Sequence, residues 1–212
     1  MRIKVCGLTD VNQVAQLDEM GMQFGGFIFY PRSPRYVFNS LSAQQIKKIK
    51  GKINKVGVFV NAPQEEVLKT IDDCGLYVAQ LHGDETPKYC ERISEYITVV
   101  KAFQVSSPEE IEWRIHEYQD VADMFLFDTP GLGYGGTGKK FDWKGLKNLN
   151  IGKPFFLSGG IGPEDHEQVK EFMEFPIAKD LFSLDINSRF EVEPGVKDLE
   201  KIKTFANHLN SK

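Results

Sequence analysis

Two residues at the ends of apolar runs carry side chains that can move protons. Cys6 follows Ile3 and Val5 and stands where a short strand gives way to a Cys-Gly turn. Asp128 directly follows the apolar run 124–127. A thiolate can remove a proton and a carboxylic acid can donate one, which requires a lowered pKa for the thiol and a raised pKa for the carboxyl group. The pair predicts acid–base chemistry if the fold brings the two together, although free cysteines more often serve as small buried packing residues.

A second group of residues has the chemistry of a phosphate site. Gly159 and Gly160 follow one predicted strand, and Asp185, Asn187 and Ser188 follow the next. Adjacent glycines let backbone N–H groups approach an anion, and Asn187-Ser188 could begin a short helix whose N-terminus points at it. A pair of glycines is often only a turn, but loops after two consecutive strands are where many barrels bind phosphate. The pattern predicts a phosphorylated small-molecule ligand.

Arg35 and His82 are the other polar side chains expected at strand ends. Pro34 stiffens the approach to Arg35, which favours a positioned guanidinium that could grip a carboxylate. A solvated loop arginine is the alternative. His82 is the only one of four histidines at a predicted strand end, which is too few for a metal site. No metal is therefore expected.

Two lysines fall inside predicted strands. Lys4 lies two positions before Cys6, so on a strand the two share a face, and an inward Lys4 could help the thiolate to form. Lys101 is a second candidate for a charge inside the fold. Either lysine could instead belong to an ordinary ion pair of the core. Cys74 and Cys90 are interpreted as packing residues.

The glycine-rich segment 133–140 has the Gly-x4-Gly-Lys spacing of a nucleotide-binding P-loop. The residue after that motif should be Ser or Thr to reach Mg²⁺, but here it is Lys140. Four glycines in six positions favour a flexible lid over a rigid phosphate cradle.

The totals are those of an ordinary single-domain protein. The chain has 212 residues, 41% hydrophobic and 26% charged, with a net charge of −4. The chain has no long run of charges of one sign, which argues against general binding to nucleic acid or to a membrane surface. No stretch is long and apolar enough to span a membrane. Three unclustered cysteines and no visible signal peptide predict a reducing cytoplasm. A monomer or a homodimer is expected.

Eight short apolar runs alternate with amphipathic helical stretches along the whole chain. Strands that alternate with helices favour parallel pairing, because parallel neighbours need a crossover. Eight units with polar residues after most of the strands predict one closed (β/α)8 TIM barrel over residues 1–212, in preference to an open doubly wound sheet. A final helix is predicted at 196–208 after a polar turn. The predicted strands are 3–6, 25–29, 55–60, 76–81, 97–103, 124–127, 155–157 and 181–184.

In order along the chain, eight motifs resemble those of phosphoribosylanthranilate isomerases of tryptophan biosynthesis. They are KVCGLT (4–9), SPRYV (33–37), VGVF (56–59), QLHG (80–83), FDT (127–129), GGTGKxFDW (135–143), LSGGI (157–161) and ExxPGxKD (191–198). Each is short, but all of them in this order are specific. The resemblance implies an Amadori rearrangement of N-(5-phosphoribosyl)anthranilate without a cofactor.

The resemblance also implies roles for individual residues. Cys6 matches the general base of the family and Asp128 its general acid. Arg35 matches the residue that holds the anthranilate carboxylate. The remaining residues expected to bind substrate are His82, Gly159, Gly160, Asp185, Asn187 and Ser188.

One departure and two rival readings qualify this picture. The family often has Ser and Gly where this chain has Asn187 and Arg189, so Arg189 either adds a phosphate contact or points to solvent. A barrel isomerase of histidine biosynthesis would have two opposed aspartates, and the cysteine at the end of the first strand, Cys6, argues against that family. A phosphate-binding barrel that only senses a metabolite would need Gly159 and Gly160 but neither Cys6 nor Asp128.

Overall fold

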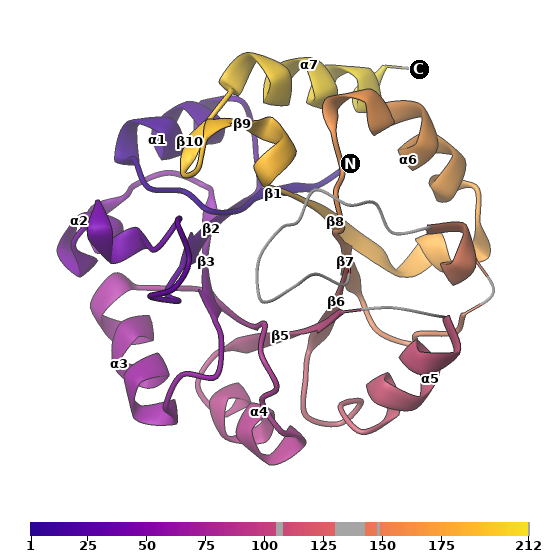
Figure 1. Ribbon diagram of the computed structural model, residues 1–212, viewed down its shortest axis with the longest axis horizontal. Coiled ribbons are helices and arrows are strands. Elements are labelled where there is room, and N and C mark those ends of the chain that lie inside the picture. Colours follow the sequence, from indigo (N-terminus) through magenta and orange to yellow (C-terminus); the bar gives the residue numbers. More distant parts are fainter. Residues whose placement is uncertain (105–107, 130–142, 148, 212) are drawn as a thin grey trace.

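A closed barrel of eight parallel strands forms the centre of the computed structural model (Figure 1). The structure describes residues 1–104, 108–129, 143–147 and 149–211. Each strand pairs with its neighbour in the chain, and β1 closes the ring against β8, which confirms the predicted (β/α)8 fold. The strands are β1 (Ile3–Val5), β2 (Phe24–Ile28), β3 (Asn54–Phe59), β4 (Val78–Leu81), β5 (Thr98–Gln104), β6 (Met124–Asp128), β7 (Phe155–Leu157) and β8 (Leu181–Ile186).

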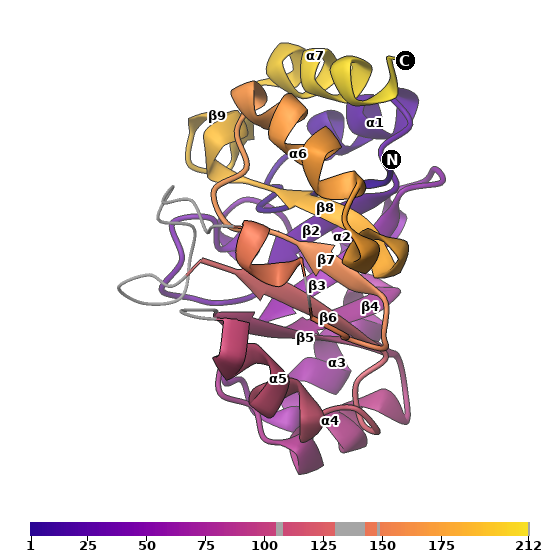
Figure 2. The ribbon, with the colours of Figure 1, turned by 90° about the vertical axis from the view of Figure 1, so that its right-hand side faces the viewer.

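Helices surround the barrel and cover its outer surface (Figures 1 and 2). Local capping explains where several of them begin: the Asp10 carboxylate accepts from the backbone N–H of Asn12 at 2.8 Å, and Ser42 and Gln45 form a reciprocal capping box. The helices are α1 (Val11–Glu19), α2 (Ala43–Lys48), α3 (Gln64–Cys74), α4 (Pro87–Ser94), α5 (Pro108–His116), α6 (His166–Met173) and α7 (Leu199–Asn210). A short 3-10 helix, Trp143–Leu146, precedes β7.

The segment after β8 differs from the prediction. A polar turn followed by a helix from residue 196 was expected, but β9 (Glu191–Glu193) and β10 (Val196–Lys197) form an antiparallel hairpin there. The turn uses Gly195, whose φ of +89° is costly for other residues. The last helix, α7, begins only at Leu199, after the capping side chain of Asp198. The hairpin lies beside α1 and β1 at the edge of the barrel (Figure 1).

A separate apolar cluster within the barrel supports the residues at the strand ends. It contains Phe24, Val56, Val78, Val100, Ala102, Leu126 and Phe156, which come from β2 to β7. Side chains on a strand alternate between its two faces, so the residue two positions further on points the same way. Val58 therefore follows Val56 toward the C-terminal mouth, Asp128 follows Leu126, and Ser158 follows Phe156. This apolar layer lies directly beneath the polar residues of the mouth.

Within the described ranges, no helix is long and apolar enough to cross a bilayer. The predicted lid and the P-loop-like spacing at 133–140 fall in the segment 130–142, which lies outside the described residues.

Candidate active site

A pocket opens at the C-terminal ends of the strands, and its cavity volume is about 220 Å³. It brings together residues that are far apart in the sequence and that lie near or after the C-terminal ends of β1, β2, β4, β6, β7 and β8. Among them are Cys6, Arg35, His82, Asp128, Gly160, Asp185, Asn187 and Ser188. These are the residues predicted for the site except Gly159, the residue before Gly160. Gln80, Ser158 and Arg189 also line the pocket.

Cys6 lies at the end of β1 and is 5% exposed. Its backbone N–H donates to the carbonyl oxygen of Ile186 at 2.9 Å, which fixes it against β8. Gly26 on β2 makes room for the thiol, because a Cβ atom there would lie 3.0 Å from the sulfur. Burial raises the pKa of the Cys6 thiol above its ordinary value of 9.0, and the nearby charges of Lys4 and Lys197 only partly oppose this. The protein alone therefore holds Cys6 as a neutral thiol.

Lys4 lies inside the barrel, but its charge is already paired. Its Nζ atom donates to both carboxylate oxygens of Asp185, at 2.9 and 3.0 Å, and its side chain has no exposed surface. Burial alone would lower the pKa of Lys4, but the carboxylate raises it. The pair is therefore ionic, and Lys4 is mainly a member of a core ion pair. Asp185, predicted to bind substrate, lines the pocket with both oxygens engaged by Lys4.

Asp128 lies at the end of a hydrogen-bonded chain of side chains. Its Oδ2 atom is 3.3 Å from Nε2 of His82, and Nδ1 of His82 is 2.7 Å from the amide nitrogen of Gln80. The backbone N–H of Thr129 and the hydroxyl of Ser158 donate to Oδ1, at 2.8 and 3.3 Å. Burial alone would raise the pKa of Asp128, but the hydrogen bond and charge of His82 hold it below the ordinary value of 3.8. Asp128 rests as a carboxylate.

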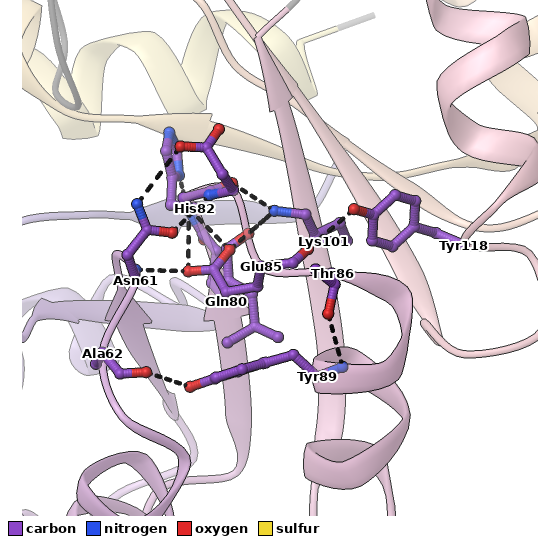
Figure 3. A network of polar contacts seen from close by, with 12 residues as sticks. Asn61, Ala62, Gln80, His82, Glu85, Thr86, Tyr89, Lys101 and Tyr118 are labelled. Carbon is purple, nitrogen blue, oxygen red and sulfur yellow. Dashed lines mark hydrogen bonds and ion pairs between the residues drawn. The ribbon is translucent and has the colours of Figure 1, made fainter.

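A buried polar network fixes the loop that carries His82 (Figure 3). The Glu85 carboxylate accepts from the backbone N–H of Gly83 at 3.0 Å and of Asn61 at 2.8 Å. Lys101 donates to Glu85 at 2.9 Å and to the carbonyl oxygen of Gly83 at 2.6 Å. Lys101 and Glu85 are 2% and 4% exposed, so Lys101 forms the core ion pair that was one of its two predicted roles. The network holds both sides of the turn after His82.

Arg35 lines the pocket, and its guanidinium is hydrogen-bonded to the carboxylate of Glu191. Its Nε atom donates to Oε1 and Oε2 of Glu191, at 2.9 and 3.0 Å, and its Nη2 atom donates to Oε2 at 2.6 Å. Lys197 donates to the same Glu191 at 2.6 Å and to Oδ1 of Asn187 at 2.8 Å. Burial alone would raise the pKa of Glu191, but the hydrogen bonds from both cations hold it below its ordinary value of 4.5. Arg35 is therefore a held group and not a loose loop arginine.

The loops after β7 and β8 contain the residues predicted to bind phosphate. Gly159 and Gly160 both have positive φ, 96° and 73°, a conformation that favours glycine. A 3-10 helix of three residues starts at Ser188. Asn187 precedes it, but its side chain bonds Lys197 and does not cap the helix. The guanidinium of Arg189 pairs with Glu164 across the two loops, so it does not simply point to solvent.

Several residues of the site were not predicted from the sequence. Glu191 and Lys197 belong to the ExxPGxKD motif, whose spacing drew attention without suggesting a contact with Arg35. Gln80 stands two positions before His82, so the strand period could have placed both on one face. Glu85 had no local signal. Among the described residues, no group of three or more His, Cys, Asp or Glu side chains could hold a metal ion.

The barrel and its pocket define a (β/α)8 protein that brings a thiol, a carboxylate, an arginine and a glycine turn together at one mouth. The model of the N-(5'-phosphoribosyl)anthranilate (PRA) isomerase family matches residues 3–208. The N-(5'-phosphoribosyl)anthranilate isomerase of Parabacteroides distasonis is 39% identical over 213 residues, covering 99% of this chain and 93% of that protein. The chain belongs to the PRA isomerase family.

Solved structures agree with this assignment. The phosphoribosyl anthranilate isomerase of Thermotoga maritima superposes with a TM-score of 0.84 at 33% identity, covering 99% of this chain and 98% of that one. A second isomerase structure, with a TM-score of 0.79 at 30% identity and the same two coverages, was solved in complex with reduced 1-(o-carboxyphenylamino)-1-deoxyribulose 5-phosphate.

Proposed function

We propose that this chain converts N-(5'-phosphoribosyl)anthranilate to 1-(2-carboxyphenylamino)-1-deoxyribulose 5-phosphate, a step of tryptophan biosynthesis, and that residues 1–212 act as one barrel domain. The observation that carries the proposal is the convergence of Cys6, Asp128, Arg35 and Gly160 on a single pocket. The ligand held by the 30% identical relative contains a carboxyphenyl group, an opened sugar and a phosphate. The pocket of this chain contains groups that could bind each of these three parts.

The two ends of the substrate bind to different parts of the mouth. The phosphate lies against the backbone N–H groups of the Gly159–Gly160 loop and of Ser188, as anions do at such turns. The carboxylate of the anthranilate ring pairs with the guanidinium of Arg35. The ribose then lies between the loops after β1, β4 and β6, within reach of Cys6, His82 and Asp128.

The reaction moves protons and requires no external electron donor or acceptor. Asp128 donates a proton to the ring oxygen of the ribose, and the ring opens to a protonated Schiff base. The thiolate of Cys6 removes the proton from C2, which gives an enolamine. A proton added at C1, together with loss of the proton from the C2 hydroxyl group, then yields the aminoketose, so that no proton is gained or lost overall. The neighbouring His82 and Ser158 keep the carboxylate of Asp128 in place between the two proton transfers.

The resting protonation of the two groups is the opposite of the working one. Cys6 rests as a thiol and Asp128 as a carboxylate, so one proton must move from the first to the second. From the ordinary values of 9.0 and 3.8, this transfer costs at least about 7 kcal/mol. A turnover of about 10 per second corresponds to a barrier of about 16 kcal/mol, so the cost fits within an ordinary enzymatic barrier. The protonation states slow the reaction but do not prevent it.

The test is a steady-state assay of the loss of substrate fluorescence. Cys6→Ala and Asp128→Ala should each lower kcat by about 10²- to 10⁴-fold, the usual contribution of general acid–base catalysis. Arg35→Ala should mainly raise KM. Normal turnover in either catalytic variant would refute the mechanism. A protein that binds inorganic phosphate without turning over the substrate would instead be a metabolite-binding barrel.

Two further features of the proposal concern where and how the chain works. We place it in the cytoplasm, which is supported by its three unpaired, buried thiols. As a monomer or as a homodimer it carries a site of its own, since the pocket is lined by residues of one chain.

A further inference from the structure

The guanidinium of Arg35 has one edge occupied before any ligand arrives. Its Nε and Nη2 atoms make three hydrogen bonds to Glu191, and the side chains of Arg35 and Glu191 are only 11% and 4% exposed. Paired bonds of this type fix the plane of a guanidinium as well as its position. Within the described parts of the chain, Nη1 has no hydrogen-bond acceptor. A ligand carboxylate can therefore be met only by the outer Nη1–Nη2 edge.

Glu191 is itself held by two further donors besides Arg35. Its Oε1 atom accepts from Nζ of Lys197 at 2.6 Å and from the backbone N–H of Gly195 at 3.1 Å. The side chain of Lys197 has no exposed surface, so its charge is committed to this cluster. Three cationic and backbone donors around one carboxylate make Glu191 a rigid support for Arg35.

The hairpin that carries Glu191 and Lys197 is fastened to the first unit of the barrel. The Thr9 hydroxyl donates to the carbonyl oxygen of Gly195 at 2.7 Å. The Gln13 side chain donates to the carbonyl oxygen of Lys197 at 2.9 Å and accepts from its N–H at 3.0 Å. Through these contacts β9 and β10 stand at a fixed place beside the loop that carries Cys6. The hairpin therefore ties the position of Arg35 to the frame that positions the base.

We propose that Glu191 and Lys197 are positioning residues for the carboxylate subsite, and that they present the outer edge of Arg35 to the substrate. The cluster holds two cations and one anion, so it carries one excess positive charge in a buried place. A substrate carboxylate offsets that charge, whereas a neutral ring would leave it uncompensated. This inference rests on the proposed function, since it assigns the support of one of its contacts.

The test compares Glu191→Gln and Glu191→Asp with Glu193→Gln, an exposed glutamate on the same hairpin. Glu191→Gln should raise KM by about tenfold or more with kcat changed less than about threefold, and Glu191→Asp should lie between it and the parent. Glu193→Gln should match the parent. Combined with Arg35→Ala, the Glu191→Gln substitution should add no further rise in KM, because it acts through Arg35.

Inhibition by two small probes separates positioning from a general disturbance of the pocket. Glu191→Gln should weaken inhibition by free anthranilate at least about fivefold and leave inhibition by inorganic phosphate unchanged. Equal weakening of both probes, or an additive effect in the double variant, would overturn the proposal. The charge-preserving pair Glu191→Gln with Lys197→Met keeps one excess positive charge, and a parental KM in that variant would overturn it as well.

The outcomes also distinguish this inference from the proposed function. If the parent chain does not turn over the substrate, the proposed function fails. If the parent turns it over and the KM of a folded Glu191→Gln is unchanged, only the inference fails. Should Glu191→Gln not fold, Glu191→Asp retains the charge, and its KM and its inhibition by anthranilate decide the matter.

Discussion

Replacing His82 tests how the protein sets the protonation state of Asp128. The imidazole is 3.3 Å from the carboxylate and is the main group that lowers the pKa of Asp128 against the effect of burial. His82→Gln can still place a neutral N–H donor near Asp128, but it cannot carry a positive charge. His82→Ala removes the hydrogen bond and the charge together. The two variants therefore separate these contributions.

The expected shift follows from the strength of the contact. A hydrogen bond to a charged group contributes about 1.5–3 kcal/mol, which corresponds to about 1–2 pKa units for a carboxyl group that loses it. Losing a partner that stabilises the carboxylate raises the pKa of Asp128. The acidic limb of the kcat/KM profile should therefore move to higher pH by about 1–2 units in His82→Ala and by less in His82→Gln.

The assay is the dependence of kcat/KM on pH, measured from acidic to neutral pH on proteins shown to be folded at each point. The substrate phosphate also ionises near pH 6. Its contribution is common to all of the proteins, so the difference from the parent isolates the enzyme group. His116→Gln, on the exposed side of α5, is the matched control. An acidic limb that stays in place in His82→Ala, or moves to lower pH, would refute the assigned link between His82 and Asp128.

Three further tests concern the Lys101–Glu85 pair, the Arg189–Glu164 pair and the buried thiol of Cys90. Lys101→Met leaves Glu85 buried without its cation and should lower the free energy of unfolding by about 3–5 kcal/mol in chemical denaturation, whereas adding Glu85→Gln should recover part of the loss. Glu164→Gln removes the ion pair of Arg189 and should strengthen inhibition by inorganic phosphate about two- to fivefold, the usual range of an exposed ion pair. Arg189→Gly should weaken that inhibition. If both variants shift the inhibition in the same direction, Arg189 does not contact the phosphate. Burial raises the pKa of Cys90 to about 12, so a thiol reagent should label it only after denaturation, and rapid labelling of the folded protein would show that the thiol is accessible.

Local patterns were sufficient to predict the barrel and the residues at its mouth. Strand and helix units alternate along the chain, and the period of two residues places Cys6 above Lys4 and Asp128 above Leu126 on inward faces. The hairpin at β9 and β10 was missed because it is too short to show a periodic pattern, and because its turn at Gly195 was interpreted as a break before a helix.

Contacts between distant segments could not be read from local patterns. Lys4 bonds Asp185 across 181 positions, and Arg35 bonds Glu191 across 156 positions. The sequence therefore left Lys4 available to activate the thiol and left Arg35 available to grip a ligand on either edge. In the structure the charge of Lys4 is paired, and one edge of Arg35 is occupied.

These pairings change the question of how Cys6 becomes a base. If Lys4 alone lowered the pKa of the thiol, activation would be a property of β1. Lys4 is paired with Asp185, and the effect of burial on the pKa of Cys6 outweighs that of the nearby cations. The proposed mechanism therefore requires the thiolate to form during the reaction, with its proton passed toward Asp128. Asp128 can receive that proton because it rests as a carboxylate beside His82. In this mechanism the protonation of Cys6 and that of Asp128 are coupled, because one group gains the proton that the other loses. A substitution at His82 that changes the pKa of Asp128 should therefore also change how readily the thiolate of Cys6 forms.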